Sequence, residues 1–260
     1  MKKSSNGRKK GSQDYYIIDR LEKKYNDPVF EVIKLSIPVI KDINHPNILQ
    51  LIDLKEDSEY YYFIYEYCDG GNLDDYLNYL KNNNKSLTEE EVQYIMKQLV
   101  EAVKYLHNKK IVYRNMKPRN ILIKYDSEED LLKKNILKSK IKLAGFTISS
   151  HLKKGEFLDI RAGTKRYMAP EILKLKLYNE KVDIWNLGII FSELLSCDVR
   201  FFSDQSIYYH EGQYFPNISK EANSFIQCML KFDPEKRESA DELSKHDFLI
   251  KDVKNFSFEN

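Results

Sequence analysis

The sequence has 260 residues, enough for one two-lobed domain or two small domains with a sizeable core. Its 42 basic and 40 acidic side chains leave a net charge of +2, which gives no general reason to expect nucleic acid or an anionic membrane as a partner. We find no apolar run of membrane-spanning length and no secretory signal. The three cysteines are far apart and form no Cys-x-x-Cys pair, which favours a reducing, cytoplasmic location.

The first part of the chain predicts a small strand-rich unit. Residues 1–14 are polar and unpatterned, and we expect a solvated tail there. The stretch 15–18 predicts a short strand, and Asp27-Pro28 predicts the start of a helix that runs to about residue 43. A strand pair is predicted at 49–54 and 60–65.

The second part of the chain predicts helices. Thr88 and Glu91 form a capping box, and apolar residues then recur at helical spacing, which predicts an amphipathic helix over 88–108. Residues 182–195 are apolar nearly all round, as expected of a helix buried in the middle of a domain. Two further helices are predicted at 219–231 and 240–245.

Five motifs then follow one another along the chain. They are Tyr113-Arg114-Asn115-Met116-Lys117-Pro118-Arg119-Asn120, Lys142-Leu143-Ala144-Gly145-Phe146-Thr147, Gly163-Thr164-Lys165-Arg166-Tyr167-Met168-Ala169-Pro170-Glu171, Asp183-Ile184-Trp185-Asn186-Leu187-Gly188 and Asp233-Pro234-Glu235-Lys236-Arg237. In this order they resemble the H-R-D, D-F-G and A-P-E motifs of the eukaryotic protein kinases, and of the Ser/Thr branch in particular. The stretch Glu-Tyr-Cys-Asp-Gly-Gly-Asn-Leu is weakly similar to autophagy-initiating and calcium-dependent kinases.

The resemblance covers roughly residues 15–250 and implies an α+β, bilobal, protein-kinase-like fold. We expect a polar N-terminal segment over 1–14, a truncated strand-rich N-lobe over 15–66, a helical C-lobe over 67–250 and a C-terminal tail over 251–260. The N-lobe is called truncated because Gly7 and Gly11 do not make the glycine-rich loop of the family. Either that loop is absent, or the chain is a fragment or starts in the wrong place.

The resemblance implies a degenerate ATP-binding site. Ile18 stands at the position of the phosphate-binding lysine and Tyr16 at the roof over adenine, although a register shifted by one places Asp19 at the lysine position. Ser36, nine residues before His45, stands at the position of the glutamate that pairs with that lysine. The hinge is assigned to Glu66, Tyr67 and Cys68, and the floor of the pocket to Leu122.

The catalytic and metal positions also depart from the family. Asn115 stands at the position of the catalytic aspartate, and an amide cannot accept the substrate proton as a carboxylate does. Gly145 stands at the position of the metal-binding aspartate, so no metal is expected. Lys117 and Asn120 are retained, either for chemistry or because they hydrogen-bond the loop backbone.

The structural residues of the family are retained. Asp183 is expected to accept N–H bonds from the catalytic loop, and Glu171 and Arg237 are expected to form a buried bidentate bridge. A hydrophobic column is predicted from Ile40, Leu51, Tyr113 and Phe146 above Asp183.

Two further hypotheses concern regulation and partners. Arg114 is the arginine that a phosphorylated residue engages in family members, and Glu156 or Asp159 is a candidate for a standing negative charge there. The region 196–215 is rich in aromatic residues, of which Tyr208-Tyr209 is the candidate interface and Phe202 and Phe215 are candidate core; the others are Phe201 and Tyr214.

These substitutions lead to a main interpretation and two alternatives. The main interpretation is a catalytically inactive pseudokinase that is not an enzyme. It acts as a scaffold or allosteric binding module for a protein partner and takes no cofactor, nucleic acid, membrane or small-molecule substrate. One alternative is a pseudokinase that binds ATP weakly and without metal at the hinge. The other is a Ser/Thr protein kinase with atypical residual activity.

Overall fold

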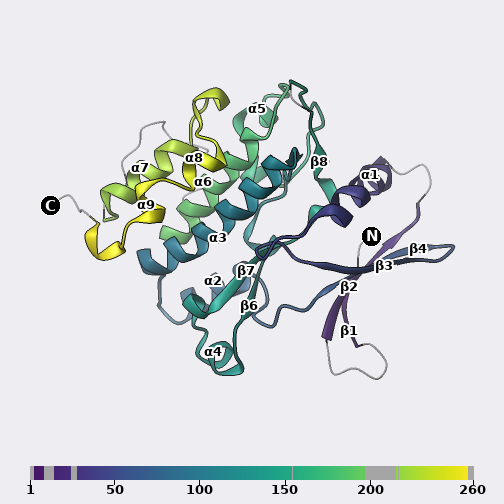
Figure 1. The fold of residues 1–260 in the computed structure, drawn as a ribbon, viewed down its shortest axis with the longest axis horizontal. Coiled ribbons are helices and arrows are strands. Elements are labelled where there is room, and N and C mark those ends of the chain that lie inside the picture. The colour runs from purple at the N-terminus through teal and green to yellow at the C-terminus, as the bar shows by residue number, and fades with distance from the viewer. Residues whose placement is uncertain are drawn as a thin grey trace.

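The computed structural model describes residues 3–8, 15–24, 28–153, 155–196, 215 and 217–256. It has two lobes, one formed by a sheet with helix α1 (Pro28–Asp42) and the other by helices gathered around α3 (Glu89–Asn108) and α6 (Lys181–Ser196) (Figure 1). This confirms the expected α+β bilobal fold. Within the described residues, no helix combines the length and the apolar character needed to cross a bilayer.

The N-terminal lobe is built on a four-stranded antiparallel sheet in the order β1-β2-β4-β3. Its strands are β1 (Lys3–Arg8), β2 (Tyr15–Glu22), β3 (Leu51–Glu56) and β4 (Tyr60–Glu66). The expectation of a solvated tail over 1–14 was wrong for 3–8. That stretch is polar and shows no alternation, yet its main chain pairs with β2 from Lys3 opposite Arg20 to Arg8 opposite Tyr15.

Helix α1 links the two lobes. It begins at Pro28, as the sequence predicts, and it runs through Pro38 to Asp42. Phe30, Ile33 and Ile40 are buried on its inner face. The helix packs against the C-terminal lobe at the 3-10 turn Phe146–Ile148 and at β8 (Ser150–His151), so α1 connects the sheet to the region of the D-F-G-like motif.

The C-terminal lobe is predominantly helical. The capping box of Thr88 and Glu91 is present at the start of α3, and the predicted helix is confirmed. Helix α6 is buried along most of its length, and a Cβ at Gly188 would lie 2.6 Å from the Leu230 side chain, so only glycine allows this close approach. The other helices are α2 (Leu73–Asn82), α4 (Glu128–Lys133), α5 (Pro170–Leu173), α7 (Lys220–Met229), α8 (Ala240–Leu243) and α9 (Asp247–Ile250).

Two small antiparallel pairs hold the segments that carry the motifs. Strand β5 (Ile111–Val112) enters the catalytic loop and pairs with β8. Strand β6 (Ile121–Tyr125) leaves the loop and pairs with β7 (Ser139–Leu143), which leads to Gly145. These pairings place the loop 113–120 beside the start of the segment 145–171, which we call the activation segment.

Candidate active site

Asp183 anchors the catalytic loop from below. Its two carboxylate oxygens each accept a 2.8 Å hydrogen bond, one from the main-chain N–H of Tyr113 and the other from that of Arg114. The side chain is fully buried, and Nε2 of His107 lies 3.0 Å from Oδ2. The predicted contact between Asp183 and the loop is therefore confirmed. The carboxylate sets the start of the loop because it satisfies two main-chain donors that burial would otherwise leave unpaired.

Part of the predicted hydrophobic column is present above Asp183. The rings of Tyr113 and Phe146 lie 4.9 Å apart between centroids, and both residues are buried. Tyr113 also donates its hydroxyl hydrogen to the carbonyl oxygen of Ala144. Ile40 is buried and Leu51 packs against the same core from the N-terminal lobe. The contact between Tyr113 and Phe146 confirms the part of the column that lies at the D-F-G-like motif.

Three residues at the centre of the site hold one another. Nδ2 of Asn115 donates to the main-chain carbonyl of Gly145 at 2.7 Å, and Nδ2 of Asn120 donates to the carbonyl of Asn115 at 2.7 Å. Gly145 has a positive φ of 78°, and a Cβ there would lie 2.9 Å from the Asn120 amide carbon. Glycine is thus required both by the backbone conformation and by the space that Asn120 occupies.

Lys117 connects the catalytic loop to the activation segment. Its ammonium group donates a 3.0 Å hydrogen bond to the hydroxyl of Thr164. The lysine is half-buried and the threonine is exposed, so the bond lies at the protein surface. It positions the end of the activation segment against the loop.

The residues around Gly145 do not fit a Mg²⁺ ion held by protein carboxylates. Mg²⁺ is bound in proteins through one or two carboxylates in near-octahedral geometry. The side chains gathered here are the amides of Asn115 and Asn120. Across the described part of the chain, no group of three or more His, Cys, Asp or Glu side chains is arranged to hold a metal. We therefore derive no catalytic step through a metal.

The faces of strand β2 bear on the register of the ATP site. Alternate residues of a strand point to opposite faces, and Asp19 and Leu21 are buried while Ile17 packs against the core on the same face. Tyr16 and Ile18 occupy the other face. This burial pattern agrees with the register shifted by one, in which Asp19 stands at the lysine position and Ile17 at the adenine roof, and both assignments stay predictions.

In this register, Asp19 brings a carboxylate to the position where the family carries a cation. Burial and this nearby carboxylate raise the pKa of Tyr65 on β4. On α1, Ser36 is fully buried and donates to the carbonyl oxygen of Ile33 at 2.7 Å. The serine at the glutamate position thus has its hydroxyl hydrogen bonded within its own helix.

The hinge is held by an ion cluster that the sequence did not reveal. The carboxylate of Glu66 accepts from Lys142 at 2.6 Å, from Lys124 at 2.9 Å and from the main-chain N–H of Gln50 at 3.1 Å. Burial raises the pKa of Glu66, but the bonds from these donors outweigh it and the pKa is lowered. Lys124 and Lys142 are 58 and 76 residues away from Glu66 in the sequence, so no local pattern could predict these contacts.

The remaining hinge residues lie beside this cluster. Burial raises the pKa of the Cys68 thiol to about 12, so the group is an unreactive thiol rather than a nucleophile. Leu122, the predicted floor, is half-buried and pairs with Asn72 in an isolated bridge. The ring of Tyr67 lies 5.6 Å from that of Tyr15.

Arg114 does not contact the acidic residues predicted for it. Its Nη1 donates to the hydroxyl of Tyr178 at 3.1 Å and its Nη2 to the carbonyl oxygen of Ile148. Tyr178 in turn donates to the carbonyl oxygen of Ile160 at 2.6 Å. Glu156 instead accepts the main-chain N–H of Lys153 at 3.0 Å. A tyrosine hydroxyl from beyond the A-P-E-like motif thus takes the place expected for Glu156 or Asp159.

The bridge between Glu171 and Arg237 is confirmed. The two guanidinium nitrogens donate to the two carboxylate oxygens at 2.6 and 2.8 Å, and both side chains are buried. This fork geometry ties the end of the activation segment to the helical lobe.

A small groove beside the catalytic loop contains another buried carboxylate, Glu193, which the sequence interpretation missed. The groove is about 50 Å³ in volume and is lined by α2, Pro118, the activation segment and Glu193 of α6. Arg166 lies 2.8 Å from Oε1 of Glu193, and the hydroxyl of Tyr167 lies 3.2 Å from the same oxygen. Burial raises the pKa of Glu193 to about 7, against the opposing effect of Arg166.

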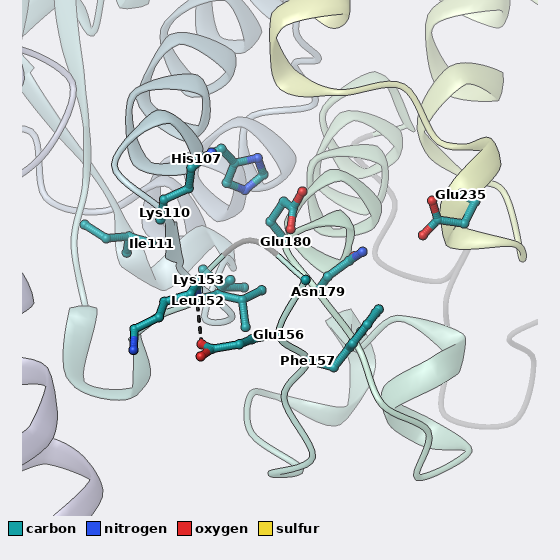
Figure 2. Close-up of a pocket in the computed structure, with 12 residues that line it drawn as sticks. His107, Lys110, Ile111, Leu152, Lys153, Glu156, Phe157, Asn179, Glu180 and Glu235 are labelled. Carbon is teal, nitrogen blue, oxygen red and sulfur yellow. Dashed lines mark hydrogen bonds between the residues drawn. The ribbon is translucent and has the colours of Figure 1, made fainter.

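A larger cavity of about 280 Å³ lies beneath the activation segment (Figure 2). Its wall includes His107 from α3, Ile111 from β5, Leu152 and Phe157 from the activation segment, and Glu180 from the turn just before α6. Charged groups of both signs surround the cavity. It is not lined by the hinge residues or by Asn115.

Part of the aromatic region lies outside the described residues, and this includes Tyr208-Tyr209 and Phe202. Phe215 is described and is half-buried, with its main-chain N–H donating to Oδ1 of Asn223 at 2.8 Å. Its assignment to the core is in keeping with this position.

The comparison with protein families decides the classification. The protein kinase domain family matches residues 3–249. The chain belongs to the protein kinase family. The Ser/Thr branch is supported by its relatives, which are named serine/threonine-protein kinases.

Three curated relatives illustrate the similarity. The serine/threonine-protein kinase H1 homolog of Danio rerio is 31% identical over 257 residues, which are 94% of this chain and 58% of the relative. Serine/threonine-protein kinase atg1 of Dictyostelium discoideum is 32% identical over 86% of this chain and 33% of its own length. Serine/threonine-protein kinase ULK3 of Xenopus laevis is 31% identical over 93% and 51%. The kinase chain described here thus spans between a third and three fifths of these relatives.

These relatives overturn the main functional interpretation of the sequence. We expected an inactive pseudokinase that is not an enzyme, whereas the proteins that match nearly the whole chain are named as Ser/Thr protein kinases. The expectation held that four substitutions together with a missing glycine-rich loop make rescue of activity improbable. General-base assistance is worth roughly 10²- to 10⁴-fold, so its loss slows transfer and leaves binding and positioning in place.

Proposed function

We propose that the chain is an atypical Ser/Thr protein kinase, which transfers the terminal phosphoryl group of ATP to serine or threonine hydroxyls at a reduced rate. The observation that carries the proposal is the intact framework beneath the catalytic loop, where Asp183 holds the main chain of Tyr113 and Arg114 at 2.8 Å. Phosphoryl transfer depends mainly on positioning and electrostatics, and this framework supplies the positioning.

The proposed roles follow from the contacts of the loop. Nδ2 of Asn115 is bonded to Gly145, which directs the amide so that its oxygen is the part left to accept a hydrogen bond from the attacking hydroxyl. An amide orients the hydroxyl without removing its proton, which passes instead to an oxygen of the transferred phosphoryl group or to water while ADP leaves. The rate therefore falls by roughly the 10²- to 10⁴-fold that a general base provides. Lys117 is proposed to bring a cation to the transferred group from its place beside Thr164.

ATP is proposed to bind at the hinge without a metal held by the protein. The ion cluster around Glu66 fixes the hinge strand against β6 and β7, with Lys142 at 2.6 Å. The residues beside Gly145 are amides, so the phosphates do not depend here on a protein-bound Mg²⁺. Asp19 is buried and Ile17 is partly buried on the same face of β2, and the proposed binding is weak because a carboxylate in place of a cation repels the phosphates.

The proposed setting is the cytoplasm, and the proposed partners are proteins that serve as substrates. The described cysteines, Cys68 and Cys228, are both free thiols, as expected in a reducing compartment. The even charge balance favours no nucleic acid or anionic membrane as partner.

The decisive experiment measures phosphate transfer and ATP binding separately. Purified chain is incubated with labelled ATP and a mixture of serine- and threonine-containing peptides, and incorporation is followed by mass spectrometry. Lys117→Ala is expected to reduce the rate, whereas the matched surface variant Lys174→Ala is expected to leave it unchanged. In parallel, ATP at about 100 times its dissociation constant should stabilise the chain by about 2.7 kcal/mol in a thermal shift, with or without Mg²⁺. No incorporation at any peptide would contradict the proposal.

A further inference from the structure

The groove beside the catalytic loop has an unusual distribution of charge. Its lining contains two carboxylates, Asp74 and Glu193, and two cations, Lys81 and Arg166. Three more cations flank it, namely Lys117 and Arg119 on the catalytic loop and Lys165 on the activation segment. The cations therefore outnumber the carboxylates at this face.

Both carboxylates are already engaged within the protein. Glu193 is only 5% exposed, pairs with Arg166 at 2.8 Å and accepts from Tyr167 at 3.2 Å. Asp74 pairs with Nε of Arg119 at 2.9 Å. A basic peptide lying across this face would therefore meet carboxylates that are already paired, and it would lie beside Arg166, whose side chain is 25% exposed.

Cations at the entrance are, in contrast, accessible to a ligand. Lys165, Arg119 and Lys81 are exposed. They come from the activation segment, the catalytic loop and α2, so they surround the groove rather than project from one element. Lys117, which is bonded to Thr164, lies on the catalytic loop two residues after Asn115.

We propose that the substrates of this kinase are proteins with acidic residues beside the acceptor serine or threonine, and that Arg166 determines this specificity. The inference rests on the proposed kinase activity and names its substrate class. Arg166 pairs with Glu193 and Arg119 pairs with Asp74, and the exposed Lys165 and Lys81 then attract acidic side chains and repel basic ones. Complementary charge of this kind selects partners chiefly by excluding those of the wrong sign.

The test compares three fluorescent peptides that share one serine flanked by glutamates, by lysines or by glutamines. Versions with alanine in place of the serine are used for binding by anisotropy at low salt, and the serine versions are used for transfer by mass spectrometry. The glutamate peptide is expected to bind about tenfold more tightly than the lysine peptide, as expected if several exposed charge pairs each contribute modestly. Added salt should reduce this difference.

Variants assign the effect to the groove. Arg166→Ala is expected to abolish the preference for the glutamate peptide, because it removes a cation from the face that the acidic side chains meet. Lys165→Ala is expected to weaken binding of the glutamate peptide about threefold. Because Lys165 is exposed, this variant should fold normally, so it tests the groove even if Arg166→Ala fails to fold. Lys174→Ala, an exposed lysine outside the groove, is the matched control and should change neither peptide.

The outcomes separate this inference from the proposed function. Selective binding of the glutamate peptide without transfer would support the inference and count against the kinase activity. Transfer that proceeds as fast or faster on the lysine peptide would support the kinase activity and overturn the inference. Failure of all three peptides to bind would also overturn it.

Discussion

Nδ2 of Asn115 donates a 2.7 Å hydrogen bond to the main-chain carbonyl oxygen of Gly145. This contact joins the catalytic loop to the start of the activation segment through groups that carry no charge. The backbone of Gly145 is left-handed, with φ at 78°, and the Asn120 side chain lies where a Cβ would stand. The centre of the site is thus arranged around glycine and two amides.

Substitution of Gly145 tests this arrangement. We expect Gly145→Ala to lower the free energy of unfolding by about 1–2 kcal/mol for the left-handed backbone and by about 1 kcal/mol more for the contact with Asn120. Urea denaturation measures both parts when Asn120→Ala and the double variant are included. In the double variant, the part of the loss that is due to the contact with Asn120 should disappear, whereas the part due to the left-handed backbone should remain. If the losses of the two single variants simply add up in the double variant, Asn120 does not limit the space at residue 145.

Loss of one partner of the buried bridge should be costly. Glu171→Gln leaves the Arg237 guanidinium buried without its counter-charge, and we expect a loss of about 3–5 kcal/mol in the free energy of unfolding. The matched control is Glu129→Gln, which removes an exposed pair with Lys133 and should cost less than about 1 kcal/mol. Chemical denaturation of the two variants decides the point, and equal small effects would contradict a buried bridge.

The buried carboxylate of Glu193 predicts a pH dependence of stability. Its pKa is raised from 4.5 to about 7 because of burial, so the folded chain binds this proton more tightly than the unfolded chain. The resulting stabilisation is fully present below pH 4.5 and is lost as pH rises through 7.

The loss should amount to something on the order of 1–3 kcal/mol. It is measured as the difference in unfolding free energy between pH 5 and pH 8, in the wild-type chain and in Glu193→Gln. The variant should lack this component, since its amide does not titrate. An identical pH dependence in both chains would argue that Glu193 titrates normally.

Tyr178 is expected to hold the activation segment in place of a phosphate. Its hydroxyl accepts from Arg114 at 3.1 Å and donates to Ile160 at 2.6 Å. Tyr178→Phe should therefore speed hydrogen exchange over 157–161 and lower the free energy of unfolding by about 1–2 kcal/mol. Peptide-resolved hydrogen exchange measures the local effect. Tyr105→Phe removes another tyrosine hydroxyl, which accepts from Asn44, and exchange over 157–161 should remain unchanged.

Features that depend on local spacing could be predicted from the sequence. The capping box of Thr88 and the period of the residues after it predicted α3, and the order of the five motifs located Asp183 below the catalytic loop. The bridge of Glu171 and Arg237 was predicted in the same way, since both residues stand within motifs whose partners are known from the family. Strand β1 was missed because a polar strand at a sheet edge carries no apolar alternation.

The sequence by itself determined the two-lobed fold, the amides of Asn115 and Asn120, and glycine at 145, because periodicity and motif order are written along the chain. Only the tertiary structure decided which face of β2 turns inward, that Lys142 and Lys124 bind Glu66, and that Arg166 binds Glu193. Those contacts join strands and helices that are distant along the chain, and their register depends on how both lobes pack. The charges within one segment do not predict which distant residue will form an ion pair with them, because packing of the two lobes decides that.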